Sequence, residues 1–240
     1  MQLSVVIPAY NEEQRIGRTL ESVGTWLAAH EKDAEIIVVN NRSTDHTADV
    51  VRSYHGQYPF LRIVDEKRPG KGYAVATGMR FATGRIRLFM DADNSTTIDQ
   101  LAAMRPFLDQ GYDVVIGSIG VKGARVLQGG GEPLWRVVFG KMANLWIQLW
   151  AVPGVWDTQR GFKVFTARAA NDIFSRMTTF GWLFDVEVLA IARARGYRIK
   201  EVPVVWDNDP NSKVKLGAYL TSLAESVKIT WNRIRGVYRR

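Results

Sequence analysis

Five short apolar runs, rich in Val and Ile, recur through the first half of the chain and constrain its fold more than any other feature. They are SVVIPA at 4–9, EIIVVN at 35–40, LRIVDE at 61–66, IRLFMDA at 86–92 and DVVIGS at 113–118, with segments of helical periodicity between them. Strands that are apolar along their whole length are buried on both faces. The alternation therefore predicts a Rossmann-like α/β fold, with a mainly parallel sheet and helices on both faces.

The chain is basic and contains no cysteine. It has 240 residues, with 32 Lys plus Arg against 24 Asp plus Glu, and a formal net charge of +8. The absence of cysteine excludes disulfides, thiolate zinc sites, iron–sulfur clusters and cysteine nucleophiles. The positive charge predicts an acidic partner, which is nucleic acid, an anionic membrane surface or a phosphorylated substrate. Residues 1–13 lack the pattern of a secretory signal, so we expect a cytoplasmic protein.

Polar segments follow the apolar runs directly. These segments are 8–11, 40–45, 68–71, 91–96 and 117–118. In open parallel sheets, ligands bind at the carboxyl ends of the strands. The sequence therefore predicts a binding site along one edge of the sheet, formed by these segments.

Asp91 and Asp93, separated by Ala92, end the fourth apolar run. Two carboxylates at a strand end can hold a divalent cation and, through it, a diphosphate. The same residues could instead cap a helix that begins near Ile98. The motif alone leaves both interpretations open.

The pattern changes beyond Ser118. Residues 161–166 and 198–206 are typical of strands, and helices are expected from about 167 and over 185–195. The window 134–152 is apolar and rich in tryptophan but carries charged residues, which favours an interface helix over a membrane span. We expect one domain over 1–212, followed by an extension over 213–240.

The extension is predicted to be a basic amphipathic helix. Its one acid is Glu225, and its apolar residues recur at helical spacing: Leu216, Leu220, Leu223, Val227, Trp231 and Ile234. Such a helix can lie in the headgroup region of an anionic bilayer, or it can pack on the sheet with a solvated basic face. The tryptophans of 134–152 favour the membrane surface.

The ordered set VVIPAYNEE, VVNNRSTDHT, RPGKGYAVATG and DADNST resembles the inverting family 2 glycosyltransferases of GT-A fold. The later segments WDTQRGFKVFT and GWLFDVEVLAIARARGYRIKEVPVVW are similar to those of the dolichyl-phosphate β-glucosyltransferase subgroup. The resemblance implies transfer of a hexose to a polyprenyl phosphate at the cytoplasmic face of a membrane, with Mg²⁺ or Mn²⁺ as cofactor. Glucose from UDP-glucose is the favoured donor. The alternatives are GDP-mannose, another UDP-sugar, or a non-catalytic relative that binds nucleotide sugars. Nucleic-acid binding would leave the strand-end motifs without a purpose, so we expect no nucleic-acid partner.

On the donor side, the resemblance implies that residues 1–118 bind the nucleotide sugar. The implied nucleotide contacts are Pro8, Ala9, Tyr10, Asn11, Glu12, Asn40, Lys71, Asp91 and Ala92, and the implied metal ligands are Asp91 and Asp93, with Asp93 the catalytic one. This chain departs from the family at Asn40, Asn41 and Arg42, where the pattern is Asp, Asp and Gly. It also has Ser95 where related mannose synthases hold metal with Gln. An amide at Asn40 favours uridine over guanosine.

On the acceptor side, the resemblance implies that residues 119–212 bind the lipid phosphate and the sugar. The implied phosphate contacts are Ser118, Arg125, Arg136 and Lys141; the sugar contacts are Gln159, Trp182 and Glu187; and the catalytic acids are Asp157 and Asp185. Ile119 replaces an arginine that is common in the family. Residues two positions apart do not share a helix face, so at most one of Asp185 and Glu187 points into the site, and we favour Asp185. A lipid monophosphate is mostly a dianion at neutral pH and needs no strong general base.

Overall fold

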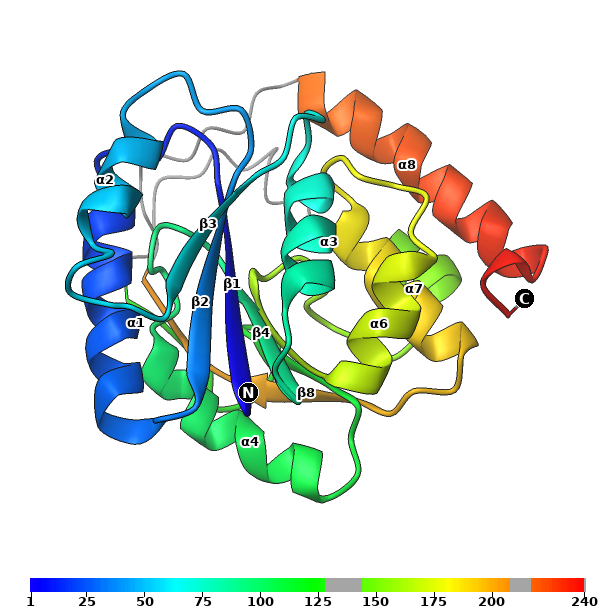
Figure 1. The fold of residues 1–240 in the computed structure, drawn as a ribbon. Coiled ribbons are helices and arrows are strands. Elements are labelled where there is room, and N and C mark those ends of the chain that lie inside the picture. The colour runs from blue at the N-terminus through cyan, green and yellow to red at the C-terminus, as the bar shows by residue number, and fades with distance from the viewer. Residues whose placement is uncertain (128–143, 208–216, 240) are drawn as a thin grey trace.

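The computed structural model describes residues 1–127, 144–207 and 217–239, and its centre is a sheet of seven strands (Figure 1). The strand order is β3-β2-β1-β4-β7-β5-β8. The strands are β1 (Leu3–Ala9), β2 (Ala34–Asn40), β3 (Leu61–Asp65), β4 (Ile86–Met90), β5 (Val114–Ser118), β7 (Phe162–Thr166) and β8 (Ile199–Pro203). All five predicted strands of the first half are confirmed.

The sheet is mainly parallel, as predicted, with one exception that the sequence did not reveal. Strands β1 to β4 pair in parallel, as do β5 and β8, whereas β7 runs antiparallel to both β4 and β5. The start of β7 therefore lies beside the end of β4. The backbone N–H of Asp91 donates to the carbonyl of Gly161 over 3.0 Å. This reversal brings the segment before β7 to the edge where the parallel strands end.

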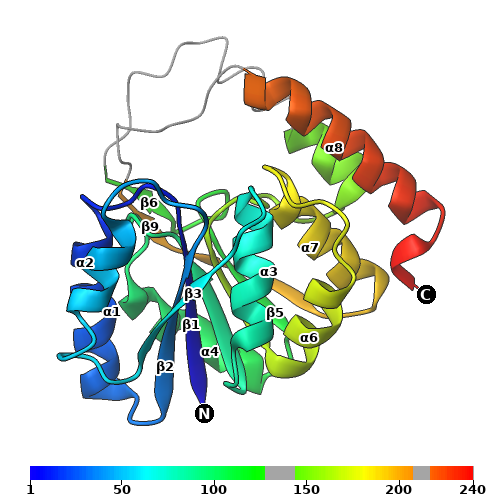
Figure 2. The ribbon, with the colours of Figure 1, turned by 45° about the horizontal axis from the view of Figure 1, so that its top comes forward.

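Helices cover both faces of the sheet, which confirms the predicted layers (Figures 1 and 2). Alternate residues of β1 point to opposite faces: Val5 and Ile7 belong to one core cluster and Val6 to the other. The first cluster includes side chains of α1 (Ile16–His30), α2 (Thr47–Ser53) and α4 (Leu101–Asp109), which follows the short helix η1 (Ile98–Gln100). The second includes side chains of α3 (Lys71–Phe81), α6 (Ala167–Ser175) and α7 (Phe184–Ala194).

Two short strands, β6 (Arg125–Val126) and β9 (Val205–Trp206), form a separate parallel pair. The predicted interface helix over 134–152 is described only from 144 onward, where it is helical and ends in the π-helical η2 (Ile147–Ala151). Its earlier part, including Arg136 and Lys141, lies outside the described residues.

The predicted C-terminal helix is present as α8 (Gly217–Ile234), followed by η3 (Val237–Arg239). It packs on α7 and η2 rather than directly on the sheet (Figure 2). Ile229 on its inner side is fully buried, whereas the predicted apolar stripe of Leu223, Val227, Trp231 and Ile234 is 53–63% exposed. Leu216 lies outside the described residues. Within the described ranges, no helix is long and apolar enough to cross a membrane.

Candidate active site

The carboxyl ends of β1, β2 and β4 form one edge, and the backbone there is unusual. Within the described parts of the chain, three non-glycine residues have a left-handed backbone: Asn11, Arg42 and Asn94, with φ of 53°, 62° and 58°. Each lies in the turn after one of these strands. Left-handed residues other than glycine are uncommon and gather at functional sites. The conformation at Arg42 also explains why glycine suits this position in the family.

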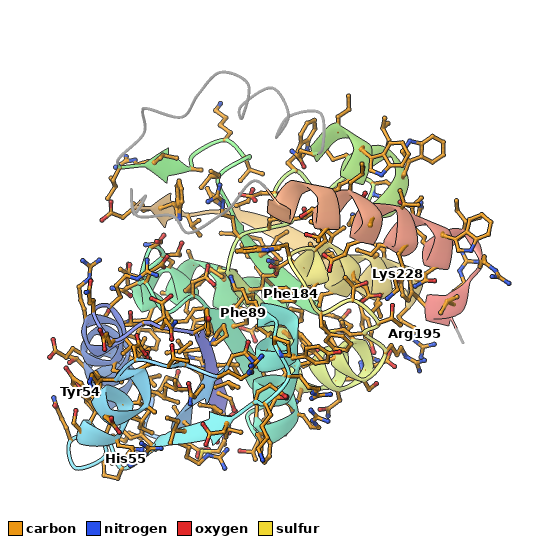
Figure 3. All side chains as sticks on the ribbon, turned by 90° about the horizontal axis from the view of Figure 1, so that it is seen from above. Tyr54, His55, Phe89, Phe184, Arg195 and Lys228 are labelled. Atoms are coloured by element: carbon orange, nitrogen blue, oxygen red, sulfur yellow. The ribbon has the colours of Figure 1, made fainter. Side chains whose placement is uncertain are left out.

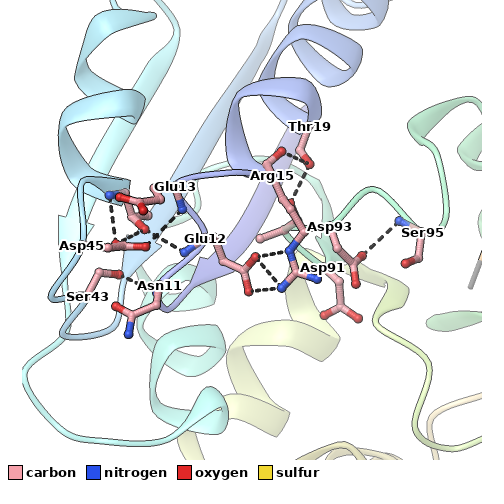
Figure 4. Close-up of polar contacts among 12 residues, drawn as sticks. Asn11, Glu12, Glu13, Arg15, Thr19, Ser43, Asp45, Asp91, Asp93 and Ser95 are labelled. Carbon is pink, nitrogen blue, oxygen red and sulfur yellow. Dashed lines mark hydrogen bonds and ion pairs between the residues drawn. The ribbon is translucent and has the colours of Figure 1, made fainter. Parts of the chain in front are cut away.

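The turns after β1 and β2 hold each other through hydrogen bonds (Figure 4). The N–H of Asn11 donates to Ser43 Oγ over 3.1 Å, and the N–H of Glu12 donates to Thr47 Oγ1 over 2.8 Å. The Glu12 carboxylate forms an ion pair with Arg15 at 2.6 Å. The two turns are therefore held together by the protein's own hydrogen bonds, and Glu12 has Arg15 as a cationic partner.

The nucleotide-contact candidates differ in accessibility. Tyr10 is 56% exposed at the edge of the sheet, whereas the side chains of Pro8, Ala9 and Ala92 are buried. Because of this burial, nucleotide contacts of these three residues fall to their backbone, and they stay predictions. The Asn40 side chain accepts from the N–H of Ser43 and donates to Asp65 Oδ1. Its predicted contact with the base stays a prediction.

Lys71, Asp91 and Asp93 meet where β4 ends and α3 begins. Lys71 Nζ lies 2.6 Å from Asp91 Oδ1, and Asp93 Oδ1 accepts from the N–H of Ser95 over 3.0 Å. Burial disfavours the charged form of Lys71, but the carboxylates of Asp91 and Asp185 together raise its pKa above the ordinary value. Lys71 is therefore a fixed cation beside two carboxylates. Neither aspartate side chain caps the helix near Ile98.

The glycines on either side of Lys71 allow the backbone at Phe180 to approach closely. A Cβ on Gly70 would lie 2.5 Å from the Phe180 carbonyl oxygen, and one on Gly72 would lie 2.7 Å from Phe180 Cα. In the structure the two glycines admit the backbone at Phe180, whose carbonyl accepts from the N–H of Gly72 over 3.0 Å.

A buried ion pair lies next to this group and was missed by the sequence analysis. Lys163 Nζ on β7 is 2.5 Å from Asp185 Oδ1 in the first turn of α7, and both side chains are at most 5% exposed. Nζ also donates to the Arg160 carbonyl. The ring of Phe89 lies 5.5 Å from Lys71 Nζ and 5.7 Å from Lys163 Nζ. A lysine inside the apolar run FKVF was the available signal, because charged side chains are rarely buried without a partner.

Burial raises the pKa of the Asp185 carboxyl above its ordinary value, and the ion pair with Lys163 opposes this shift. The structure thus gathers two lysines and three aspartates from β4, β7, α3 and α7. In the described residues, no group of three or more His, Cys, Asp or Glu side chains is placed to hold a metal ion. Asp91 and Asp93 alone could supply oxygen ligands from the protein, and Mg²⁺ is often bound by one or two carboxylates, with waters and substrate phosphates completing its shell.

Asp157 holds the turn after β5 in place. Its Oδ2 accepts from the N–H of Ile119 over 2.9 Å and from Arg160 Nε over 3.2 Å. Ser118 is fully buried and its Oγ accepts from the N–H of Gly120, so its predicted contact with an acceptor phosphate stays a prediction. The Arg160 guanidinium stacks on Trp206 at 4.1 Å and is a further cation at this edge, not predicted from the sequence.

The remaining acceptor-side candidates are spread out. Arg125 is exposed on β6, Gln159 is exposed before β7, and Trp182 is 47% exposed before α7. Glu187 is fully buried, and its carboxylate accepts from the N–H groups of Thr178 and Thr179 and from Tyr238. Both carboxylate oxygens thus have partners within the protein, and the predicted sugar contact of Glu187 stays a prediction. That only one of Asp185 and Glu187 faces the charged group agrees with their spacing on the helix.

Solved glycosyltransferases have the same fold. Glucosyl-3-phosphoglycerate synthase from Mycobacterium tuberculosis, in complex with Mn²⁺, UDP-glucose and phosphoglyceric acid, matches with a TM-score of 0.71 at 20% identity, over 97% of this chain and 79% of that one. A mannosyltransferase from Pyrobaculum calidifontis, in complex with GDP-mannose and Mn²⁺, matches with a TM-score of 0.63 at 24% identity, over 97% and 64%. The sheet, with its carboxylate pair at the end of β4, defines a glycosyltransferase of GT-A fold.

The family is narrower than this class. The family model described as glycosyl transferase family 2 matches residues 4–170. A dolichyl-phosphate β-glucosyltransferase of Trichomonas vaginalis is 34% identical over 234 residues, which cover 93% of this chain and 69% of that protein. The chain therefore belongs to glycosyltransferase family 2, as its motifs indicated.

Proposed function

We propose that this enzyme transfers glucose from UDP-glucose to a polyprenyl monophosphate, with inversion at the anomeric carbon. One observation carries the proposal: Lys71, Asp91 and Asp93 meet the Lys163–Asp185 pair at the end of the sheet where this class binds donors. The similarity to a dolichyl-phosphate β-glucosyltransferase over 93% of the chain supports the choice of donor and acceptor.

Residues 1–118 form the donor half in this proposal. Asp91 and Asp93 hold Mg²⁺ or Mn²⁺, which fits a site whose other ligands are water and the diphosphate. The metal, when bound, neutralises negative charge that develops on the leaving diphosphate. Lys71 lies beside the proposed metal ligand Asp91, so in this proposal its ammonium group also neutralises charge on the diphosphate. The turns after β1 and β2, joined by the hydrogen bonds from Asn11 to Ser43 and from Glu12 to Thr47, form the surface on which the nucleoside rests in this proposal.

Residues 119–212 form the acceptor half. A phosphate oxygen of the lipid attacks the anomeric carbon, the bond from that carbon to the diphosphate breaks, and UDP leaves. The acceptor is already an anion, so the site needs cations that position it rather than a base. Arg160, which pairs with Asp157, is a described cation of this half, and Lys163 pairs with Asp185. Asp185 orients a sugar hydroxyl or the nucleophile in this account, and Arg125, Arg136 and Lys141 stay predicted phosphate contacts.

In this proposal the enzyme works at the cytoplasmic face of a membrane, and the exposed apolar side of the C-terminal region supports contact with a membrane surface. Figure 3 shows residues 144–151 beside α8. The side chains of Trp146, Trp150 and Trp231 in these two segments are 40–57% exposed. The exposed residues are Leu145, Trp146, Leu149, Trp150, Leu223, Val227, Trp231, Ile234 and Val237. Arg233 lies in the last turn of α8, and Arg235 follows directly after the helix. Apolar and aromatic residues beside basic ones are typical of segments that rest in an anionic headgroup region.

A donor panel tests the proposal. Purified protein with Mg²⁺ or Mn²⁺ and polyprenyl phosphate is incubated with labelled UDP- and GDP-sugars, and the label that partitions into organic solvent is counted. We expect label from UDP-glucose. Label from GDP-mannose alone would keep the reaction and overturn the donor. Binding of UDP with no transfer would favour a non-catalytic relative.

A further inference from the structure

Helix α8 contacts the loop that leads into α7. We call residues 178–183 the bridging loop. The N–H of Leu183 donates to Glu225 Oε2 on α8 over 2.9 Å, and Lys228 Nζ donates to the Thr178 carbonyl over 2.5 Å. A Cβ on Gly181 would lie 2.1 Å from Glu225 Oε1, so the carboxylate is seated directly against the loop. Glu225 is half-buried and is the one acid in 213–240.

The other side of the bridging loop contacts the segment that carries Lys71. The Phe180 carbonyl accepts from the N–H of Gly72, and the rings of Phe180 and Tyr73 stack with centroids 3.9 Å apart. Gly70 and Gly72 allow this approach, as described above. The backbone on both sides of Lys71 therefore rests on the bridging loop.

The loop thus connects α8 with the charged group. It carries Trp182, it precedes Asp185 by two residues, and it supports Lys71 beside Asp91. A side chain that fixes the loop also fixes the backbone from which Lys71 reaches the carboxylates. The exposed apolar stripe of α8 does not take part in these contacts. One side of the helix is therefore exposed, and another side contacts the bridging loop.

We propose that Glu225 is a positioning residue: through the bridging loop it holds Lys71 in place to bind the donor diphosphate. The inference rests on the proposed function, because it assumes that Lys71 meets a nucleoside diphosphate. It predicts that removing the Glu225 carboxylate weakens diphosphate binding at a distance, and that this loss depends on Lys71.

A double-mutant cycle tests this dependence. UDP binding is measured by calorimetry with Mn²⁺ for wild type, Glu225→Ala, Lys71→Ala and the double variant. We expect Glu225→Ala to weaken UDP binding about tenfold in the wild-type background and less than about twofold in the Lys71→Ala background, since coupled residues are not additive. Equal losses in both backgrounds, or unchanged affinity in Glu225→Ala, would overturn the proposal.

Three further variants separate positioning from a general loss of structure. Glu225→Gln keeps an oxygen that accepts from Leu183, so it should retain most of the affinity. Gly181→Ala should reproduce the loss, because its Cβ displaces the carboxylate without removing it. Ser222→Ala, on the same helix, is the matched control and should bind UDP as wild type does. If Glu225→Ala does not fold, Gly181→Ala decides: wild-type affinity in that variant would overturn the proposal.

Failure of the proposed function has a different signature. Wild-type protein that binds neither UDP nor GDP with Mn²⁺ would overturn the proposed donor site, and this inference with it. Wild-type protein that binds UDP, with Glu225→Ala binding equally well, would overturn the positioning role alone.

Discussion

The site is built from ion pairs whose members come from different elements. Asp91 and Asp93 follow β4, Lys71 begins α3, Lys163 lies on β7 and Asp185 lies in the first turn of α7. The two lysines flank the ring of Phe89, and each has a carboxylate within 2.6 Å. Single substitutions should therefore have two distinguishable effects. Loss of a charged side chain at the donor site should change transfer and UDP binding, whereas loss of a charged side chain in the core should change the free energy of unfolding.

Replacing Asp93 tests the donor end. Asp93→Ala should lower transfer by about a hundredfold or more, because a lost metal ligand leaves charge on the leaving group uncompensated. Calorimetry should also show that UDP binding no longer responds to Mn²⁺. Ser95→Ala is the control, since the hydrogen bond to Asp93 comes from the Ser95 backbone. Full activity in Asp93→Ala would refute the metal assignment.

Replacing Lys163 tests the core. Lys163→Met leaves Asp185 buried without its cation, and removing one partner of a buried pair costs about 3–5 kcal/mol of unfolding free energy. Urea denaturation should show this loss. The double variant Lys163→Met with Asp185→Leu should recover most of it, because both charges are then gone. A single variant as stable as wild type would show that the pair is not buried as described.

At the scale of elements, the turn between β3 and α3 is held by one carboxylate. Glu66 accepts from the Arg68 side chain and from Thr77 Oγ1 on α3, at 2.7 and 2.6 Å. The hydrogen bonds from Arg68, followed by that from Thr77, lower the pKa of Glu66 to about 2, although burial opposes the shift. The turn that leads to Lys71 is therefore sensitive to acid.

The pH dependence follows from this lowered pKa. A carboxyl whose pKa is lower in the folded state stabilises the protein above its unfolded value of 4.5, and the contribution is lost as the pH falls toward about 2. Glu66→Gln should remove about 2 kcal/mol of unfolding free energy at pH 7, discounted for the exposed Arg68 partner, and should flatten the dependence between pH 4.5 and 2. Urea titrations at several pH values measure this. Identical slopes for the variant and wild type would contradict the assignment.

The exposed stripe of α8 makes a separate prediction. Replacing Leu223 and Trp231 together by Ser should weaken co-sedimentation with anionic vesicles about tenfold or more, because the apolar area that these side chains bury in the bilayer is lost. Stability in urea should change little, since both side chains are more than half exposed. Ser222→Ala is the control. Undiminished vesicle binding would show that this stripe does not contact lipid.

At the scale of the whole molecule, the sequence predicted the strands and layers because buried parallel strands have a strong apolar pattern. The direction of β7 was not predictable, because a buried strand has the same pattern in either direction. The pairing of Lys163 with Asp185 depends on that direction. The burial of Ser118 and Glu187 depends on contacts between distant segments, which neither their residue types nor the resemblance could predict. That Lys71 lies beside Asp91 agrees with the prediction that the polar segments after the strands share one edge.

The most direct test of the account is the structure of the product made from UDP-glucose and polyprenyl phosphate. The donor carries an α-linked glucose, so a single displacement by the lipid phosphate inverts that carbon. Nuclear magnetic resonance of the purified lipid should show a β-linked glucosyl phosphate. An α-linked product would contradict the single displacement, and a product without glucose would contradict the proposed reaction.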